Sequence, residues 1–186
     1  MKIFIAGPRA ISKLSNEVIA KLDNIIKNNY IILVGDANGV DKAIQKHYSE
    51  KKYTNVIVYA SNGKVRNNIG GWNIVKVDVP SNIKGFDFYT AKDLKMAKDS
   101  DYGFMIWNGK SKGSFNNVLN LVSFNKTAII YFTPNKNFYK VENFDDITKL
   151  VALSNNPEIT DFFNKSNLKK KQLSFTEGEQ LKLSSL

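Results

Sequence analysis

Short apolar segments, several of which end at a glycine, alternate along this chain with segments that have helical periodicity. The apolar segments are KIFIAG (2–7), YIILVG (30–35), NVIVYA (55–60), NIVKVDV (73–79), YGFMIW (102–107) and TAIIYF (127–132). Several of them are apolar at almost every position, which is typical of parallel strands covered on both faces. We therefore expect an α/β fold, with a doubly wound, mainly parallel sheet and helices on both faces.

The segments between these strands predict four helices, over about 16–27, 40–51, 88–98 and 115–124. Ser15 is expected to cap the first helix, and Leu94 is spaced with Ala91 and Ala97 for the buried face of the third. Residues 136–163 add a short strand at 139–141 and helices around 145–153 and 157–163. We expect one domain over 1–163, followed at 164–186 by a basic tail or an added edge strand (QLSF).

The composition excludes several classes of site. The 186 residues include no cysteine and one histidine, which excludes disulfides, zinc ribbons and a thiol nucleophile and gives no basis for a histidine metal site or triad. His47 is in helical register with Val40, Ala43 and Ile44, so we expect it at the core or its edge. No metal or cofactor is expected.

No apolar stretch reaches the roughly 18 residues that a membrane helix needs, and MKIFIAG is too short for a signal-peptide core. We expect a cytoplasmic protein that does not enter a membrane. The formal net charge is +10, and five lysines against two glutamates put +3 of it into residues 164–186. The remaining surplus is scattered lysine without interleaved aromatic residues, so most of it is expected to be solvated surface.

Three glycine-containing loops follow predicted strands: GPR (7–9), GDANGVD (35–41) and NGKSKGS (108–114). Ligands bind at the carboxyl ends of strands in open parallel sheets. In the third loop, glycines let the backbone approach an anion, and the N–H groups of the following helix favour negative charge. Ser111 and Ser114 add hydroxyl groups, and Lys110 and Lys112 add charge. The alternative is an ordinary strand-to-helix turn with Ser114 as the N-cap.

The second loop is less specific on its own. Asp36 could bind a ribose hydroxyl, cap the helix or face solvent. Asp41 falls in the first helical turn, where the helix dipole stabilises a carboxylate whatever its function. Trp107, which ends the strand before the third loop, could pack in the core or stack on a base or ribose.

Four motifs in order carry a resemblance to a known family. They are a first strand ending in G-[SP]-R, then V-G-D-A-x-G-V-D-K, then F-Y-x-A-K-D-x-x-M-A-x-x-[AS]-D, then M-x-W-[DN]-G-K-S-x-G-[ST]. Over residues 1–133 the chain resembles the SLOG superfamily of Rossmann-like nucleotide-binding proteins. That superfamily includes the LOG phosphoribohydrolases, the DNA-processing protein A fold and many small bacterial and phage proteins, to which this chain looks closest.

The resemblance implies a ligand built on a nucleotide, a nucleoside or an ADP-ribose-like sugar phosphate. Matched to the motifs, the implied ligand-binding residues are Gly7, Arg9, Gly35, Asp36, Gly39, Asp41, Gly109, Ser111, Gly113 and Ser114. Lys92 stands where relatives often have a basic residue, and it could reach a phosphate or lie on a solvated helix face. A homodimer or higher homo-oligomer is also implied, and Phe115, Val118, Leu119 and Val122 could serve either the core or that interface.

The chain departs from the hydrolase motif P-G-G-x-G-T-x-x-E at its last position, where it has Asn117. Cleavage of an N-glycosidic bond needs a carboxylate to stabilise or attack an oxocarbenium-like state or to activate water, and an amide supplies neither charge nor basicity. Asn117 is therefore expected to contact the ligand without cutting it. Asp36, Asp87 and Asp93 are candidates for a relocated catalytic carboxylate, whereas Asp101 precedes its strand and should lie at the opposite end of the sheet.

Three hypotheses follow. The first is a protein that binds a nucleotide, cyclic nucleotide or ADP-ribose-type ligand as a sensor or sequestering protein, for which phage or bacterial immunity is a suitable setting. The second is a nucleotide N-glycosidase or phosphoribohydrolase with a relocated carboxylate, so whether the chain is an enzyme stays open. The third is a binder of single-stranded nucleic acid, which the basic charge supports.

Overall fold

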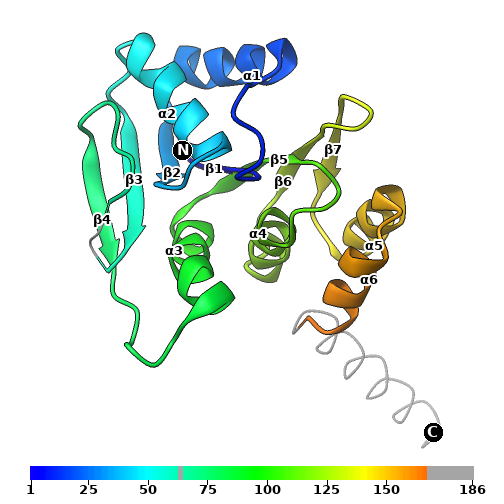
Figure 1. The fold of residues 1–186 in the computed structure, drawn as a ribbon. Helices are drawn as coiled ribbons and strands as arrows, with labels where there is room; N and C mark the ends of the chain where they lie inside the picture. Colours follow the sequence, from blue (N-terminus) through cyan, green and yellow to red (C-terminus); the bar gives the residue numbers. More distant parts are fainter. Residues whose placement is uncertain (63–64, 167–186) are drawn as a thin grey trace, which may run out of the picture.

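The structure, a computed structural model, describes residues 1–62 and 65–166. Its centre is a seven-stranded sheet in the order β4-β3-β2-β1-β5-β6-β7 (Figure 1). The strands are β1 (Lys2–Ala6), β2 (Ile31–Gly35), β3 (Val56–Ser61), β4 (Asn73–Val77), β5 (Tyr102–Trp107), β6 (Ala128–Phe132) and β7 (Asn137–Val141). All neighbouring strands are parallel except β7, which pairs with β6 in the antiparallel sense. The predicted mainly parallel α/β fold is confirmed.

The strand order reverses next to β1. From β1 the chain adds β2, β3 and β4 in one direction and then crosses back to place β5 on the other side of β1. The described part of the β3–β4 connection, residue 62 and residues 65–72, contains no helix. Because ligands of open α/β sheets bind where the strand order reverses, the carboxyl ends of β1 and β5 are the place to look for a site.

Helices cover both faces of this sheet. The helices α1 (Asn16–Lys27) and α2 (Val40–Glu50) lie on one face, and α3 (Gly85–Asp99) and α4 (Lys112–Ser123) lie on the other. The helices α5 (Phe144–Ser154) and α6 (Pro157–Asn164) pack beside α4 (Figure 1). Alternate residues of β1 serve the two layers, since Ile5 packs with the α1–α2 layer and Phe4 with the α3–α4 layer. Among the described helices, none is both long and apolar enough to span a bilayer.

Two helices begin earlier than the sequence pattern predicts. The helix α3 starts at Gly85, whose φ of 63° allows a sharp turn, and the ring of Phe86 in its first turn contacts Phe162 of α6 at 5.8 Å. The helix α4 starts at Lys112, because Ser111 and not Ser114 is the N-cap: its Oγ accepts a hydrogen bond from the Ser114 N–H. Both extensions are stabilised by contacts that helical periodicity does not reveal.

The predicted apolar face of α3 is wrong at Leu94, which is 46% exposed. The buried residues of α3 are instead Lys92, Met96 and Ala97. Ala97 is buried as predicted, but the place expected for Leu94 is taken by Met96 and by the Lys92 side chain, which turns inward toward carboxylates. The spacing of apolar residues gave the wrong environment for Leu94 because it takes no account of a lysine that is buried and paired with a carboxylate.

The structure also shows where Trp107, the apolar residues of α4, His47 and Asp101 lie. Trp107 is fully buried and stacks on Phe115 at 5.4 Å; Phe115, Val118, Leu119 and Val122 are buried in the α3–α4 layer, and a homodimer stays a prediction. His47 has a partner in α1, with Nε2 2.9 Å from Asp23 Oδ1. Asp101 accepts a hydrogen bond from the Lys2 N–H at the amino ends of the strands, as expected. The predicted edge strand QLSF lies outside the described residues.

Candidate functional site at the strand-order reversal

A cavity of about 300 Å³ opens at the carboxyl end of β1, where the strand order reverses. Its walls come from the β1–α1 and β2–α2 loops, from α2 and α3, and from the start of α4. The residues that line it are Ala6, Gly7, Arg9, Ala37, Asp41, Phe86, Tyr89, Thr90, Lys92, Asp93, Ser111, Gly113, Ser114 and Asn117. We call this the first cavity.

The start of α4 presents hydrogen-bond donors to the first cavity. Trp107 donates its indole N–H to the carbonyl oxygen of Ser111 at 3.1 Å, which fixes the N-cap. Within the described chain, the backbone N–H groups of Lys112 and Gly113 have no acceptor. A Cβ atom added to Gly113 would meet nothing within 4 Å. Gly113 lines the first cavity, whereas Lys112 lines the groove between α3, α4 and α6. The first turn of α4 therefore faces the first cavity at Gly113, in the place where a helix favours an anion.

Asn117 lies one turn further along α4 and is only 2% exposed. Its Oδ1 is buried, and no donor among the described residues reaches it. Leaving a buried acceptor unpaired costs about 1–3 kcal/mol. Because Asn117 also lines the first cavity, its side-chain amide borders the space that a ligand would fill.

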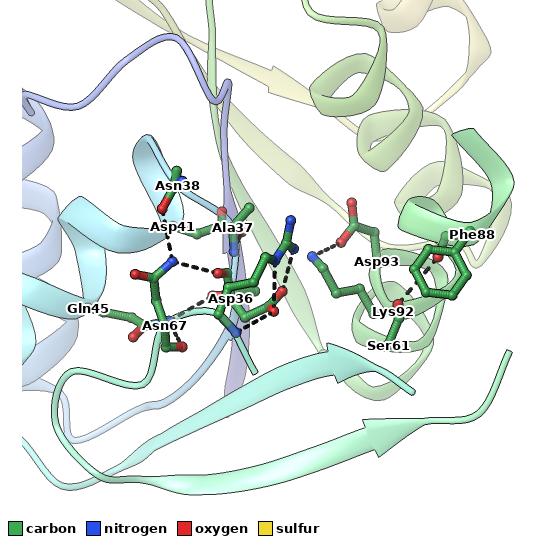
Figure 2. Close-up of polar contacts among 12 residues, drawn as sticks. Asp36, Ala37, Asn38, Asp41, Gln45, Ser61, Asn67, Phe88, Lys92 and Asp93 are labelled. Atoms are coloured by element: carbon green, nitrogen blue, oxygen red, sulfur yellow. Dashed lines mark hydrogen bonds and ion pairs between the residues drawn. The ribbon is translucent and has the colours of Figure 1, made fainter. Parts of the chain in front are cut away.

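A buried ionic cluster of Asp41, Lys92 and Asp93 forms another part of the wall. Lys92 of α3 is 4% exposed, and its Nζ lies 2.6 Å from Asp93 Oδ1. Asp41 of α2 accepts a hydrogen bond from the Ala37 N–H at 3.3 Å. Asp41 Oδ2 and Lys92 Nζ both lie directly over Gly35, where a Cβ atom would collide with each of them. Figure 2 shows Lys92 and Asp93 with Asp41 nearby. Because Gly35 has no side chain, there is room above it for the side chains of Asp41 and Lys92.

Burial and neighbouring charges set the protonation of the cluster. Burial raises the pKa of Asp41 to about 7, against the lowering influence of Lys92 and with a further rise from Asp93. Burial acts to lower the pKa of Lys92, but the carboxylates of Asp93 and Asp41 outweigh it and hold that pKa above its ordinary value. Near neutral pH, Lys92 is therefore charged while Asp41 exchanges its proton.

The raised pKa of Asp41 predicts a pH-dependent stability. Between the unfolded value of about 4 and the folded value of about 7, the folded state binds more protons than the unfolded state. The free energy of unfolding should therefore fall as the pH rises from about 4 to about 7. Urea unfolding of the wild type and of Asp41→Asn at several pH values measures this, and the variant should lack that part of the pH dependence. Identical pH profiles would contradict the assignment.

A second cavity, of about 440 Å³, is lined by Asp36, Ser61, Asn62, Arg66, Phe88 and Tyr89, and it shares Tyr89 with the first. Arg66 donates to Asp36 through Nε to Oδ2 at 3.0 Å and Nη2 to Oδ1 at 2.6 Å, and its backbone N–H donates to Oδ2 at 3.1 Å. Burial acts against the charge of Asp36, but the hydrogen bonds and charge of Arg66 hold its pKa below the ordinary value. Asp36 is therefore ionised, and both of its carboxylate oxygens accept hydrogen bonds from Arg66.

The loop that carries Arg66 is fixed to the β2–α2 loop. Asn67 donates through Nδ2 to the Asp36 carbonyl at 2.8 Å and to Asn38 Oδ1 at 3.1 Å. The buried Gln45 of α2 donates to the carbonyl oxygens of Gly35 and Asn67 at 2.9 and 3.1 Å (Figure 2). The sequence of this stretch, SNGKVRNNIGG (61–71), is rich in turn-forming residues and indicates only a surface loop, so neither Arg66 nor Tyr89 was expected at a site. Tyr89 stands in the motif F-Y-x-A-K-D, which could have marked it, whereas no motif contains Arg66.

The structure gathers most, but not all, of the residues implied by the resemblance. Asp36 lies at the second cavity, and Gly35, Gly39 and Gly109 line neither cavity. Gly39, with φ of 81°, packs against the backbone of Arg9, and Gly109, with φ of 73°, packs against the ring of Phe132. The residues at the first cavity are Gly7, Arg9, Asp41, Lys92, Ser111, Gly113, Ser114 and Asn117.

The three candidate carboxylates are separated by the fold. Asp93 lines the first cavity, Asp36 is bound to Arg66 at the second, and Asp87 is exposed in a groove between α3, α4 and α6. The described residues contain no group of three or more acidic or histidine side chains that could hold a metal ion.

No family model matches this sequence, and no curated protein matches it significantly. Among solved structures, the chain is similar to DNA processing protein A from Helicobacter pylori, whose structure is described as showing a unique single-stranded DNA binding mode. The superposition has a TM-score of 0.53 and 17% sequence identity, and it covers 70% of this chain and 64% of that chain. The chain thus spans less than two thirds of this neighbour, and the likeness confirms the Rossmann-like fold.

Proposed function

We propose that the first cavity binds one nucleotide unit through its sugar and phosphate. The observation that carries this proposal is the buried side-chain amide of Asn117, whose oxygen has no partner among the described residues, beside Gly113 in the wall of the first cavity. The N–H group of Gly113 would bind the phosphate, and the Arg9 guanidinium would add charge. A ribose hydroxyl would donate to Asn117. The position at the strand-order reversal supports the same assignment.

Binding without cleavage is the form of this function that the charges favour. Asn117 carries no charge, and the carboxylate of Asp93 is engaged by Lys92 at 2.6 Å. Retention without turnover would suit a sensor or a sequestering protein for a signalling nucleotide. The hydrolase alternative would rest on Asp93, because it is the candidate carboxylate that lines the first cavity. Release of free base from a nucleotide panel, lost in Asp93→Asn, would establish that alternative.

Single-stranded nucleic acid is the second candidate source of the nucleotide unit. The specific observation in its favour is the likeness to DNA processing protein A, described with a single-stranded DNA binding mode. The net charge of +10 also supports a polyanionic partner. Of the two sources, this comparison favours the strand over the free nucleotide. Affinity for an oligonucleotide that falls steeply with added salt and exceeds that for mononucleotides would establish it.

Asn117→Leu is expected to weaken nucleotide binding at least tenfold while raising the free energy of unfolding by about 1 kcal/mol. Leucine removes the buried oxygen of Asn117 that has no partner among the described residues, which raises the stability of the unliganded protein. Leucine also removes the amide group that would hydrogen-bond the ligand, which lowers the affinity. Calorimetric titration and urea unfolding measure the two effects.

Asn116→Leu is the matched control. Asn116 is adjacent in α4 but faces the groove between α3, α4 and α6 instead of the first cavity. This control should leave nucleotide affinity unchanged. An Asn117→Leu protein that binds nucleotide as tightly as the wild type would refute the proposed site.

A further inference from the structure

We infer that the second cavity is a subsite for another phosphate group of the same ligand, so that the ligand carries two phosphates on a nucleotide framework that passes Tyr89. This inference rests on the proposed function of the first cavity. The inference narrows the ligand to compounds with two phosphates, because a mononucleotide with a single phosphate would occupy only the first cavity.

The guanidinium of Arg66 is held in place with donors to spare. An arginine side chain has five N–H donors, and Asp36 occupies one on Nε and one on Nη2. The other three have no acceptor among the described residues. The Arg66 side chain is 38% exposed whereas that of Asp36 is 2% exposed. Arg66 therefore presents a fixed donor edge to the second cavity, and a ligand would not have to order it.

The side chains of Asn62 and Ser61 in the second cavity already have partners. Asn62 donates to the Val79 carbonyl at 3.1 Å and accepts from the Val79 N–H at 2.7 Å. Ser61 donates to the Phe88 carbonyl at 3.3 Å. Apart from the Tyr89 hydroxyl, the free groups among the described residues are thus N–H donors of Arg66. A base edge needs both donors and acceptors, but a phosphate needs donors alone, so an anionic group fits this cavity better.

Tyr89 connects the two cavities. It lines both of them, and its ring centroid lies 4.8 Å from Cζ of Arg9 and 5.8 Å from Cζ of Arg66. Arg9 belongs to the first cavity and Arg66 to the second. The exposed ring therefore lies close to two guanidinium groups, and a sugar or base between two phosphates could pack against it. Two sources share this chemistry: a free dinucleotide, and consecutive nucleotides of a single strand.

The test compares the calorimetric affinities of a nucleoside 5′-monophosphate, the 5′-phosphorylated dinucleotide of the same base and an eight-nucleotide DNA strand. The wild type should bind the dinucleotide at least tenfold more tightly than the mononucleotide. The double variant Asp36→Asn/Arg66→Gln should lose that gain and keep its mononucleotide affinity. Removing both charges together avoids leaving Asp36 unpaired, and Tyr89→Leu, at an exposed position, should reduce the gain without affecting folding.

Lys46→Gln is the control for net charge, because Lys46 is exposed on α2 and pairs with Glu50 on the same helix; it should keep the gain. Equal affinities of the wild type for mononucleotide and dinucleotide would overturn the second subsite alone. Absence of binding for all three probes would overturn the proposed function as well. A gain that is still larger for the eight-nucleotide strand supports the subsite with a strand as the source, and an equal gain supports it with a free dinucleotide.

Discussion

Replacing Lys92 with methionine is expected to lower the free energy of unfolding by about 3 kcal/mol. Removing one partner of a buried ionic cluster leaves the others without compensation, which typically costs about 3–5 kcal/mol. Protonation of Asp41, whose pKa is already about 7, relieves part of this cost. Methionine is similar in length and apolar, so the packing around Lys92 is largely kept. Urea unfolding measures the change.

The matched control for this prediction is Lys95→Met on the same helix. Lys95 also pairs with a carboxylate, with Nζ 2.6 Å from Asp99 Oδ1, but its side chain is 47% exposed. Exposed pairs of this kind contribute less than about 1 kcal/mol. Equal losses in the two variants would show that the buried cluster of Lys92, Asp41 and Asp93 does not have the energetic role described here.

Gly39→Ala is expected to destabilise the fold by about 3 kcal/mol or more. Gly39 has φ of 81° and ψ of −129°, a conformation that costs other residues about 1–3 kcal/mol. A Cβ atom there would also collide with the backbone of Arg9, which cannot rotate away as a side chain can. The β1–α1 loop would have to move, carrying Arg9 away from the first cavity. The variant should therefore lose nucleotide affinity together with stability.

Gly71→Ala separates the two causes. Gly71 also has a positive φ, of 66°, but a Cβ atom there would meet nothing within 4 Å. This variant should show only the conformational cost, about 1 kcal/mol, with unchanged nucleotide binding. If Gly39→Ala were no more destabilising than Gly71→Ala, the close packing of the first two loops would be contradicted.

Much of the fold could be predicted because it depends on local patterns. Strands that are apolar on both faces, an N-cap at Ser15 and glycine after two strands indicate a parallel sheet without knowledge of distant contacts. The position of the site follows from the same pattern, since the loops at residues 7–9, 35–41 and 108–114 all follow strand ends that meet at one edge of the sheet.

The contacts between distant segments could not be predicted in this way. Lys92 and Asp41 come from α3 and α2, and only the folded sheet brings them together over Gly35. Apolar periodicity favoured Leu94 for the buried face because it gives no weight to a lysine that is paired inside the protein. The bond between Arg66 and Asp36 likewise joins a turn-rich loop to a strand end thirty positions away, and neither sequence segment indicates it.

Native mass spectrometry with a nucleotide panel tests the central claim most directly. The panel should contain mononucleotides, linear and cyclic dinucleotides, ADP-ribose and a short DNA strand, each mixed with the wild type and with Asn117→Leu. We predict an adduct on the wild type that persists unchanged over hours and is weakened at least tenfold in the variant. An adduct of equal strength on both proteins, or no adduct on the wild type, would contradict nucleotide binding in the first cavity.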